Sequence, residues 1–444
     1  MQIAFVTLFL GLTLGAYPVE LAVEGPVAAV ELVLDGTVVG RIQGPPWTGQ
    51  IDFGASLAPH ELAARALDAN GQEVARTRQW VNLPRPAAEV EVLLEGVGKP
   101  STARLTWQSR TGAQPRSVSL TLDGQPLTLG PDGRAALPPY DPESAHVLSA
   151  EVHFAPSVVA RTDAVFGGKY GSEVSTDLTA VPVRVRRGKL TGASLRGQLL
   201  AGGAPLAVAA VDDGPAEVFL VRDLGADESL KELGDVRKRR TVQGQGMNQR
   251  LSIEHDYLRY EIGLRKEDEV RFIWPVPRTY SGSGGVPAEL FDWSRAYTLR
   301  DGGVHWLLTR LMAAPGAASG RQRLADAVAV AGLQALSGSR PRAVVLVLGA
   351  SPMDASRYDP ATVRRYLDSI RVPLFVWSVE KNGAASPVLA DWGKVEDVST
   401  LTRFRAAVAR LRDELESQRI VWVEGTHLPH SIALGPGAAG VELP

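Results

Sequence analysis

The stretch RAVVLVLGASPMDASRYDPATVRRYLDSIRVPLFVWSV occupies residues 342–379 and decides the fold of the last half of the chain. Residues 343–348 are an unbroken apolar run that is too short for a helix, a pattern typical of a strand covered on both faces. Asp359-Pro360 then begins a helix, with an N-cap and a proline at the first helical position. A second apolar strand follows at residues 373–379. Together they predict a parallel βαβ unit, and ligands bind at the carboxyl ends of such strands, here residues 349–354.

The totals limit the possible classes of protein. A chain of 444 residues with a hydrophobic fraction of 45% predicts a globular protein of roughly two to four domains. A formal net charge of −2 provides no overall field that would attract nucleic acid. The absence of cysteine excludes disulfides, thiolate metal sites and cysteine nucleophiles.

The amino terminus has the only long apolar run, IAFVTLFLGLTLGA at residues 3–16. It is short for a membrane span and suits the core of a signal peptide, so we interpret residues 1–16 as that signal. The protein is then expected in the periplasm or outside the cell, with no transmembrane span beyond this segment. Because Met1-Gln2 carries no Lys or Arg, the alternative is that the run forms the first β-strand of the folded domain.

Residues 17–86 and 87–185 each read as a small β-sandwich. In both, an alternating strand runs into Asp-Gly, a strong hairpin signal, at Asp35-Gly36 and Asp123-Gly124. The segments beginning at His60 and His146 are also similar, so the two copies lie about 87 residues apart. The first copy resembles the bacterial immunoglobulin-like modules through VELVLDGTVVG, HELAARALDANGQ and the Pro45-Pro46-Trp47 turn. Both histidines are expected at turns or strand edges rather than as ligands.

Residues 186–444 alternate strands with helices. The patterns predict strands at 217–222, 269–276, 419–423 and 431–434, a hairpin of residues 195–200 and 205–211, and helices at 305–312, 324–336 and 401–415. Ser399 is the expected N-cap of the last helix. Arg237-Lys238-Arg239-Arg240 is interpreted as a solvated loop, with a polyanion site as the alternative.

The order and spacing of these elements resemble a von Willebrand factor A domain of the exported bacterial kind. The motifs concerned are EVFLVRD, RKEDEVRFIW, SGRQRLADAVAVAGLQAL and RAVVLVLGASPMD. The resemblance covers residues 187–434. The expected fold is therefore multidomain, with two all-β immunoglobulin-like sandwiches followed by a doubly wound, Rossmann-like α/β domain at residues 186–444.

The family's metal site is altered in this sequence. The resemblance implies Asp-x-Ser-x-Ser after the first strand, then a Thr and a later Asp, which give hard oxygen ligands to Mg²⁺ or Mn²⁺. The positions here are Asp223, Gly225, Asp227, Gln322 and Gly349. We therefore expect no metal or other cofactor. The alternative is a shifted Mg²⁺ or Mn²⁺ site made by Asp223, Asp227 and Asp354, with Ser351 as a fourth ligand.

No enzyme signature is complete in the sequence. P-loop, H-E-x-x-H and G-x-S-x-G motifs are absent. Ser351 is only loosely placed like a nucleophile, and its base would have to be His305, His427 or His430. Glu424, His427 and His430 could bind a metal, but Pro429 favours a structural turn.

The hypothesis is therefore an exported, non-enzymatic protein that binds a protein partner through strand-end loops, with a metal-dependent adhesin and, more remotely, a serine hydrolase as alternatives. The expected contact loops are residues 223–230, 278–286 and 349–358, because loops on a rigid sheet can vary while the scaffold holds them. Their candidate binding residues are Asp223, Gly225, Asp227, Tyr280, Gln322, Gly349, Ser351 and Asp354. Trp274 is expected in the core.

Overall fold

The computed structural model describes the chain in ranges. They are residues 2–9, 11–84, 88–95, 100–109, 114–123, 125–143, 146–155, 158–167, 170–175, 178–185, 190, 195, 197–212, 214–234, 264–265, 267–280, 288–298, 311, 321–337, 340–381, 383, 387–438 and 440–444. The chain divides into two compact units. One contains Met1–Pro84, Ala180–Val421 and Leu428–Pro444, and the other contains Arg85–Thr179 and Trp422–His427.

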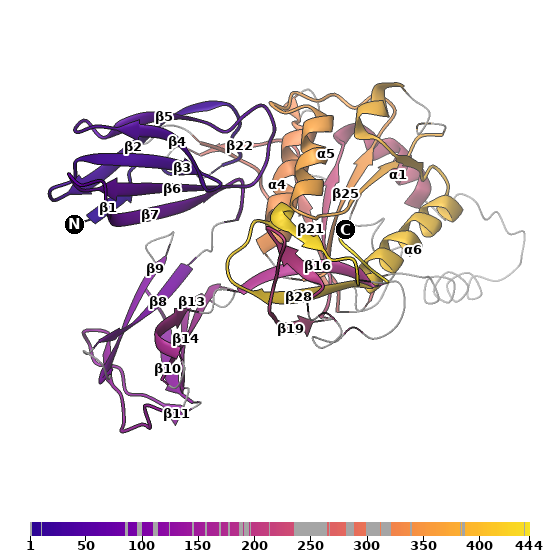
Figure 1. Cartoon of the computed structure of the whole chain (residues 1–444). Helices are drawn as coiled ribbons and strands as arrows, with labels where there is room; N and C mark the ends of the chain where they lie inside the picture. The colour runs from indigo at the N-terminus through magenta and orange to yellow at the C-terminus, as the bar shows by residue number, and fades with distance from the viewer. Residues whose placement is uncertain are drawn as a thin grey trace, which may run out of the picture. The chain divides into compact units, whose positions relative to one another are not determined.

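The first unit begins with a β-sandwich (Figure 1). One sheet has the order β1-β2-β5 and the other β4-β3-β6-β7. The strands are β1 (Gln2–Phe5), β2 (Ala16–Glu24), β3 (Ala29–Leu34), β4 (Thr37–Ile42), β5 (Thr48–Asp52), β6 (His60–Leu67) and β7 (Glu73–Val81). The hairpin predicted at Asp35-Gly36 is confirmed: both residues have positive φ, 49° and 82°, as a type I′ turn requires. Alternate residues of the two sheets, such as Val19 and Leu62, meet in one apolar core.

The apolar run near the amino terminus lies inside this sandwich. Residues Gln2–Phe5 pair with β2 in antiparallel register, and Phe9 packs edge-on against Tyr17 and Phe53. Further along, the Thr13 N–H donates to the Asn82 side chain at 2.7 Å. Residues Gln2–Phe5 thus form the first strand of the folded domain, which was the alternative interpretation of this run. Export of the protein remains a prediction.

The second unit is also a two-sheet sandwich. Its sheets have the orders β12-β9-β8 and β11-β10-β13-β14-β15. The strands are β8 (Ala88–Glu95), β9 (Thr102–Ser109), β10 (Ser117–Leu122), β11 (Gln125–Pro126), β12 (Arg134–Ala136), β13 (His146–Ala155), β14 (Val158–Gly167) and β15 (Tyr170–Ser175). Leu105, Leu120 and Leu148 share one core. The predicted end at residue 185 differs, because β16 (Leu178–Val185) leaves this sandwich for a sheet with β19, β28 and β30.

The largest sheet in the described part of the chain has six strands in the order β24-β21-β20-β25-β26-β27. They are β20 (Glu217–Arg222), β21 (Glu269–Ile273), β24 (Tyr297–Thr298), β25 (Arg342–Leu348), β26 (Leu374–Ser378) and β27 (Val395–Asp397). All neighbours pair in parallel except β24, an antiparallel edge strand. This is the order of a doubly wound sheet.

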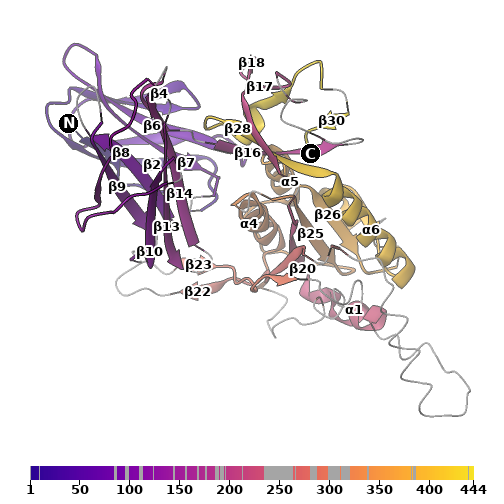
Figure 2. The same ribbon diagram turned by 90° about the horizontal axis from the view of Figure 1, so that it is seen from below.

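Helices cover both faces of that sheet. They are α1 (Asp227–Gly234), α4 (Leu324–Ser337), α5 (Pro360–Ser369) and α6 (Leu401–Ser417). Val345 and Val347 of β25 pack in the same cluster as residues of α1 and α6, whereas Val344 and Leu346 pack in the cluster that contains α4 and α5. Figure 2 shows α4 and α6 on opposite sides of β25 and β26. The βαβ unit predicted from residues 342–379 is confirmed.

Smaller elements depart from expectation. The strands expected near the carboxyl terminus, β28 (Gln418–Glu424) and β29 (Ile432–Leu434), exist but join small outer sheets rather than the central one. These sheets have the orders β19-β28-β16-β30 and β18-β17-β29, built from β17 (Leu199–Ala201), β18 (Ala204–Pro205), β19 (Val208–Asp212) and β30 (Val441–Glu442). The predicted N-cap at Ser399 is wrong: the Thr400 side chain accepts from the Arg403 N–H.

Candidate functional site

Asp223 lies at the carboxyl end of β20 and is only 1% exposed. Both of its carboxylate oxygens accept hydrogen bonds. Oδ1 accepts from the Gly225 N–H at 2.9 Å and from the Gln322 amide at 2.7 Å. Oδ2 accepts from the Gly349 N–H at 3.0 Å. The structure therefore brings four of the residues selected from the sequence into direct contact.

Gln322 joins three segments at this point. Its amide nitrogen donates to Asp223 and also to the Met353 carbonyl at 2.6 Å, and its amide oxygen accepts from the Leu224 N–H at 3.1 Å. The residue is 1% exposed, so these bonds are made away from water. From the sequence, Gln322 stands where the resemblance implies Thr and is a candidate binding residue. That its amide donates to the buried carboxylate follows from the tertiary structure.

Asp227 faces a guanidinium. Arg222 is the last residue of β20, is 2% exposed, and contacts Asp227 Oδ1 at 2.6 Å while also donating to the Leu311 carbonyl. Burial lowers the pKa of Arg222, and the nearby carboxylates of Asp227 and Asp223 oppose that shift. The sequence did not single out Arg222, because an arginine at the end of an apolar strand gives no signal of its burial.

The carboxylate of Asp354 accepts hydrogen bonds from the amino terminus of α4. Its oxygens accept from the N–H groups of Leu324 at 2.9 Å and Ala325 at 3.1 Å, so it caps α4 from a different segment of the chain. The Ser356 N–H donates to it as well, at 2.9 Å. Ser351 is exposed, and among the described residues it makes no hydrogen bond to a histidine. The three carboxylates of the alternative metal site thus have separate protein partners.

The loop at residues 349–358 is only partly free. Tyr358 is 8% exposed, and its hydroxyl donates to the Leu12 carbonyl at 2.6 Å. The Arg357 guanidinium donates to the Tyr17 hydroxyl at 2.9 Å. The expectation that the whole loop is an open contact surface is therefore wrong for its last residues, which bind the first sandwich; Met353 remains 60% exposed.

The loop expected at residues 278–286 lies mainly outside the described residues. Its beginning is β22 (Arg278–Tyr280), which pairs with β23 (Ala288–Leu290), Tyr280 lying opposite Ala288. Trp274 stacks on Phe272 and packs against the core, as expected. Leu290, the last residue of β23, is 53% exposed, and Trp293, just beyond this strand, is 48% exposed.

The histidines of the two sandwiches have equivalent structural partners. The Nδ1 atom of His60 lies 2.7 Å from Asp35, and that of His146 lies 2.6 Å from Asp123. Each aspartate begins the Asp-Gly turn of its sandwich. The expected turn role is thus confirmed, and it explains why Asp-Gly and His recur together in the sequence.

Of the remaining candidates, the described histidine His427 has structural partners. The His427 ring nitrogen Nε2 lies 2.9 Å from the Glu424 carbonyl, and the backbone N–H of His427 donates to the Thr179 hydroxyl, as in a structural turn. His305 and the basic run at residues 237–240 lie outside the described residues. Within the described ranges, no three His, Asp or Glu residues gather in a way that could hold a metal. In that same part of the chain no helix combines the length and apolar character that a membrane crossing needs.

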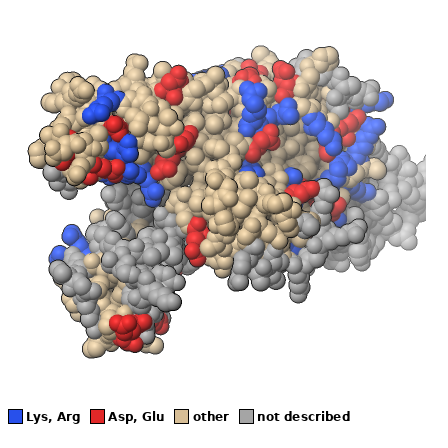
Figure 3. Space-filling view, viewed as in Figure 1, with Lys and Arg blue, Asp and Glu red and all other residues tan. Residues whose placement is uncertain are grey.

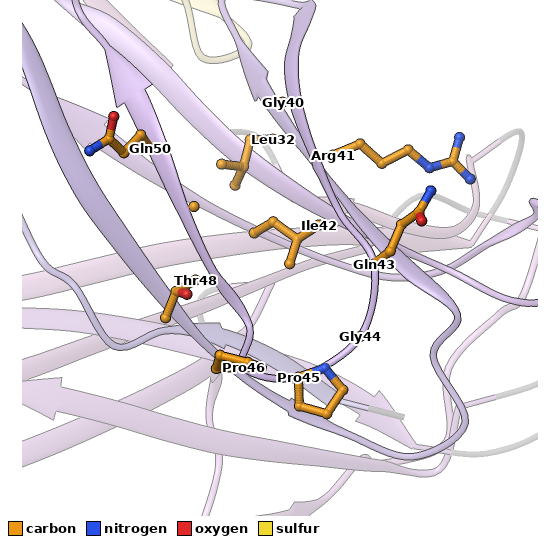
Figure 4. A pocket seen from close by; sticks show the side chains of 11 residues that line it. Leu32, Gly40, Arg41, Ile42, Gln43, Gly44, Pro45, Pro46, Thr48 and Gln50 are labelled. Carbon is orange, nitrogen blue, oxygen red and sulfur yellow. The ribbon is translucent and has the colours of Figure 1, made fainter.

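A pocket of about 380 Å³ lies elsewhere, between the edge strands β4 and β5 of the first sandwich. Figure 4 shows the side chain of Ile42 near that of Leu32, whereas Arg41 and Gln43 point away from them. Alternation along a strand explains this arrangement, since neighbours point to opposite faces. Four of the residues that line the pocket are nevertheless polar: Arg41, Gln43, Thr48 and Gln50.

One buried charge was not expected from the sequence. Arg342, at the start of β25, is fully buried, and its guanidinium nitrogens have no hydrogen-bond partner among the described residues. Burial lowers its pKa to about 10, and the nearby Glu217 opposes the shift. On the face of the molecule drawn in Figure 3, basic and acidic side chains lie interspersed. Arg403–Asp397 and Arg410–Glu396 are two ion pairs between side chains of opposite charge.

Comparison with known proteins adds little. No family model and no curated protein matches the chain. Among solved structures, the fibronectin(III)-like modules of Clostridium thermocellum CbhA are similar over 38% of this chain and 94% of theirs, at 15% identity and a TM-score of 0.16. The central fibronectin-III array of RIM-binding protein covers 45% of this chain and 84% of its own length, at 10% identity and a TM-score of 0.23.

A β-glycosidase from Bacteroides vulgatus is similar over 37% of this chain and only 24% of its own, at 12% identity and a TM-score of 0.21. No activity follows from so partial a similarity. With TM-scores this low, the assignment of the first two regions as immunoglobulin-like β-sandwiches depends on their own sheets. None of these three structures is described as a von Willebrand A domain, so that resemblance stays a proposal.

Proposed function

We propose that this is an exported, non-enzymatic protein that binds a protein partner through a von Willebrand A-like domain at residues 186–444, which works without a metal ion. The strand order and the antiparallel edge strand β24 support this, because they give the doubly wound architecture that the resemblance implies. Asp223 and Gly349 directly follow β20 and β25, and the carboxyl ends of the strands are where such sheets bind ligands.

The observation that carries the proposal is the set of hydrogen bonds around Asp223. A cation needs oxygen ligands, and Mg²⁺ demands near-ideal octahedral geometry at about 2.0–2.1 Å. Both oxygens of Asp223 instead accept N–H groups, and one of these is the amide of Gln322. Hydrogen bonds from neutral donors satisfy the buried carboxylate, so a metal would have to displace them.

The charge near Asp223 supports the same conclusion. Arg222 places a buried positive charge beside Asp227. The nearby carboxylate of Asp223 also favours the charged form of Arg222. A divalent cation brought to this place would meet that guanidinium at short range in a poorly screened environment. The Arg222 guanidinium therefore already supplies the positive charge that a metal ion would bring to these carboxylates.

Recognition would then depend on shape and apolar contact. Met353, Leu290 and Trp293 are exposed apolar side chains in the segments that follow β25 and β21. Aromatic residues and methionine are enriched in the buried cores of protein interfaces. We propose these residues as the anchors for the partner.

Isothermal titration of the full chain with Mg²⁺ and with Mn²⁺ tests the metal-free part of the proposal. We expect no binding at sub-millimolar concentration. Sub-millimolar binding that disappears in Asp223→Ala would instead establish the metal-dependent adhesin.

The binding part is tested by capture of partners from an extract with the full chain. The triple variant Met353→Ser, Leu290→Ser and Trp293→Ser should lose what the wild type captures. Val38→Ser with Val39→Ser is a matched control, because these exposed valines lie in β4 of the first sandwich. Equal capture by the triple variant and the control would reject these anchors.

A further inference from the structure

The loop that bears Met353 also binds the first sandwich. Its last two residues make both contacts: Tyr358 donates to the Leu12 carbonyl at 2.6 Å and Arg357 to the Tyr17 hydroxyl at 2.9 Å. Apolar packing accompanies them, since Leu12, Leu14 and Leu57 belong to the cluster formed by residues of α4 and α5. These contacts are made by the end of the sandwich at which β1 leads into β2.

The same two residues also form hydrogen bonds with the first turn of α4. The N–H groups of Arg357 and Tyr358 donate to the Asp326 carboxylate at 3.1 and 3.2 Å. Asp326 is only 8% exposed and lies in the first turn of α4. A displacement of the loop would therefore leave a buried carboxylate short of donors, which is costly.

From α4 the connection reaches Asp223. The Ala355 N–H donates to the Gln322 carbonyl at 2.9 Å, and the Gln322 side chain donates to both Asp223 and the Met353 carbonyl. Hydrogen bonds thus link Leu12 and Tyr17 in the sandwich to the carboxyl end of β20. All of them pass through residues 353–358.

We propose that the first sandwich is an intramolecular regulator of the partner-binding loop: docked on Arg357 and Tyr358, it holds residues 349–358 in one conformation, and release of the sandwich frees the loop. The idea rests on the proposed function, because it assigns that loop to a partner. A partner that binds another conformation of residues 349–358 must therefore compete with the docked sandwich.

Hydrogen exchange of the full chain, read by mass spectrometry, tests the coupling without any partner or metal. Tyr17→Phe removes only the hydroxyl that accepts from Arg357. We expect exchange in residues 349–358 to rise about three- to tenfold, as the loss of one hydrogen bond predicts. Exchange of residues 222–226 should rise with it, because the Leu224 and Gly225 N–H groups depend on Gln322 and Asp223.

Two further variants complete the test. Tyr358→Phe should have the same effect, and it should also accelerate exchange in residues 11–17 of the sandwich. Tyr140→Phe is the matched control, because it removes a 2.8 Å bond from a tyrosine hydroxyl to the Pro100 carbonyl in the other unit. It should leave residues 349–358 unchanged.

The proposal is overturned if Tyr17→Phe and Tyr358→Phe leave exchange in residues 349–358 and 222–226 at the level of the control. It is overturned equally if the acceleration stays within residues 11–17. Neither result would affect the titration or the capture experiment, so failure of this coupling and failure of the proposed function can be told apart.

Discussion

At the scale of single residues, the chemistry of the site is set by what donates to Asp223. A buried carboxylate is tolerated only when it is hydrogen-bonded or paired. Here two backbone N–H groups and one side-chain amide do this, and only the amide can be removed by mutation. Gln322 is therefore the residue on which the metal-free site depends.

Replacement Gln322→Met keeps the length of the side chain and removes its three hydrogen bonds. The free energy of unfolding should fall by about 2–4 kcal/mol, because Asp223 stays buried with one donor fewer. Urea denaturation of the full chain measures this change. Gln334→Met, at a partly buried position of α4, is the control and should change stability by less than about 0.5 kcal/mol. Equal values for the two variants would refute the role given to Gln322.

A second residue-scale prediction concerns His146. Its hydrogen bond with Asp123 raises its pKa above 6.5, so the charged form is stabilised in the folded state. This contribution is complete below the unfolded pKa of about 6.5 and is lost as pH rises through the folded value. Thermal unfolding of the wild type and of His146→Gln should therefore differ most in mild acid, and the difference should shrink above neutrality. A difference that grows with pH would contradict this sign.

At the scale of elements, aspartates from the loop after β25 cap the amino termini of α4 and α5. Asp359 caps α5 locally, since its side chain accepts from the Thr362 N–H at 2.8 Å. At the amino terminus of α4, the acceptor is instead Asp354, about thirty residues later in the chain, which accepts from the N–H groups of Leu324 and Ala325. One aspartate thus fixes both the start of α4 and the loop after β25.

Replacement Asp354→Ala should lower the free energy of unfolding by about 1–2 kcal/mol, the range for loss of a helix cap. Asp354→Asn keeps an acceptor oxygen and should cost less. Asp359→Ala at α5 is the matched comparison with a local cap. Chemical denaturation provides the values, and an Asp354→Ala variant as stable as the wild type would show that the cap contributes nothing.

At the scale of the whole molecule, the first sandwich and the α/β region share one apolar cluster within the first unit. The segment that reads as a signal peptide contributes to it through Leu12 and Leu14, and Phe9 lies in the core of the sandwich. Residues 1–16 therefore contribute to the packing of both the first sandwich and the α/β region.

A chain of residues 17–444 should be less stable than the full chain by at least about 3 kcal/mol, because the loss of a buried phenylalanine such as Phe9 alone has this cost. Val6→Ser with Leu8→Ser in the full chain is the control, since both side chains are about half exposed. Comparison of their unfolding curves decides the matter. Equal stability of the short and full chains would favour the interpretation of residues 1–16 as a signal peptide.

Local patterns in the sequence were enough for the elements that depend on neighbouring residues. The Asp35-Gly36 hairpin follows from turn chemistry, and the N-cap at Asp359 follows from one side chain and the next three residues. The strand at Arg342–Leu348 follows from an apolar run. Such features are encoded within a few residues, where steric and hydrogen-bonding rules act directly.

The sequence by itself thus determined the order of strands and helices, the repeated Asp-Gly and His pattern, and which residues stand at the carboxyl end of β20. Only the tertiary structure decided that the Gln322 amide donates to Asp223, that Arg222 is buried beside Asp227, and that Tyr358 binds the first sandwich. These contacts join residues about 5 to 350 positions apart. Their partners are chosen by packing of whole elements, because the direction and burial of a side chain depend on everything placed around it.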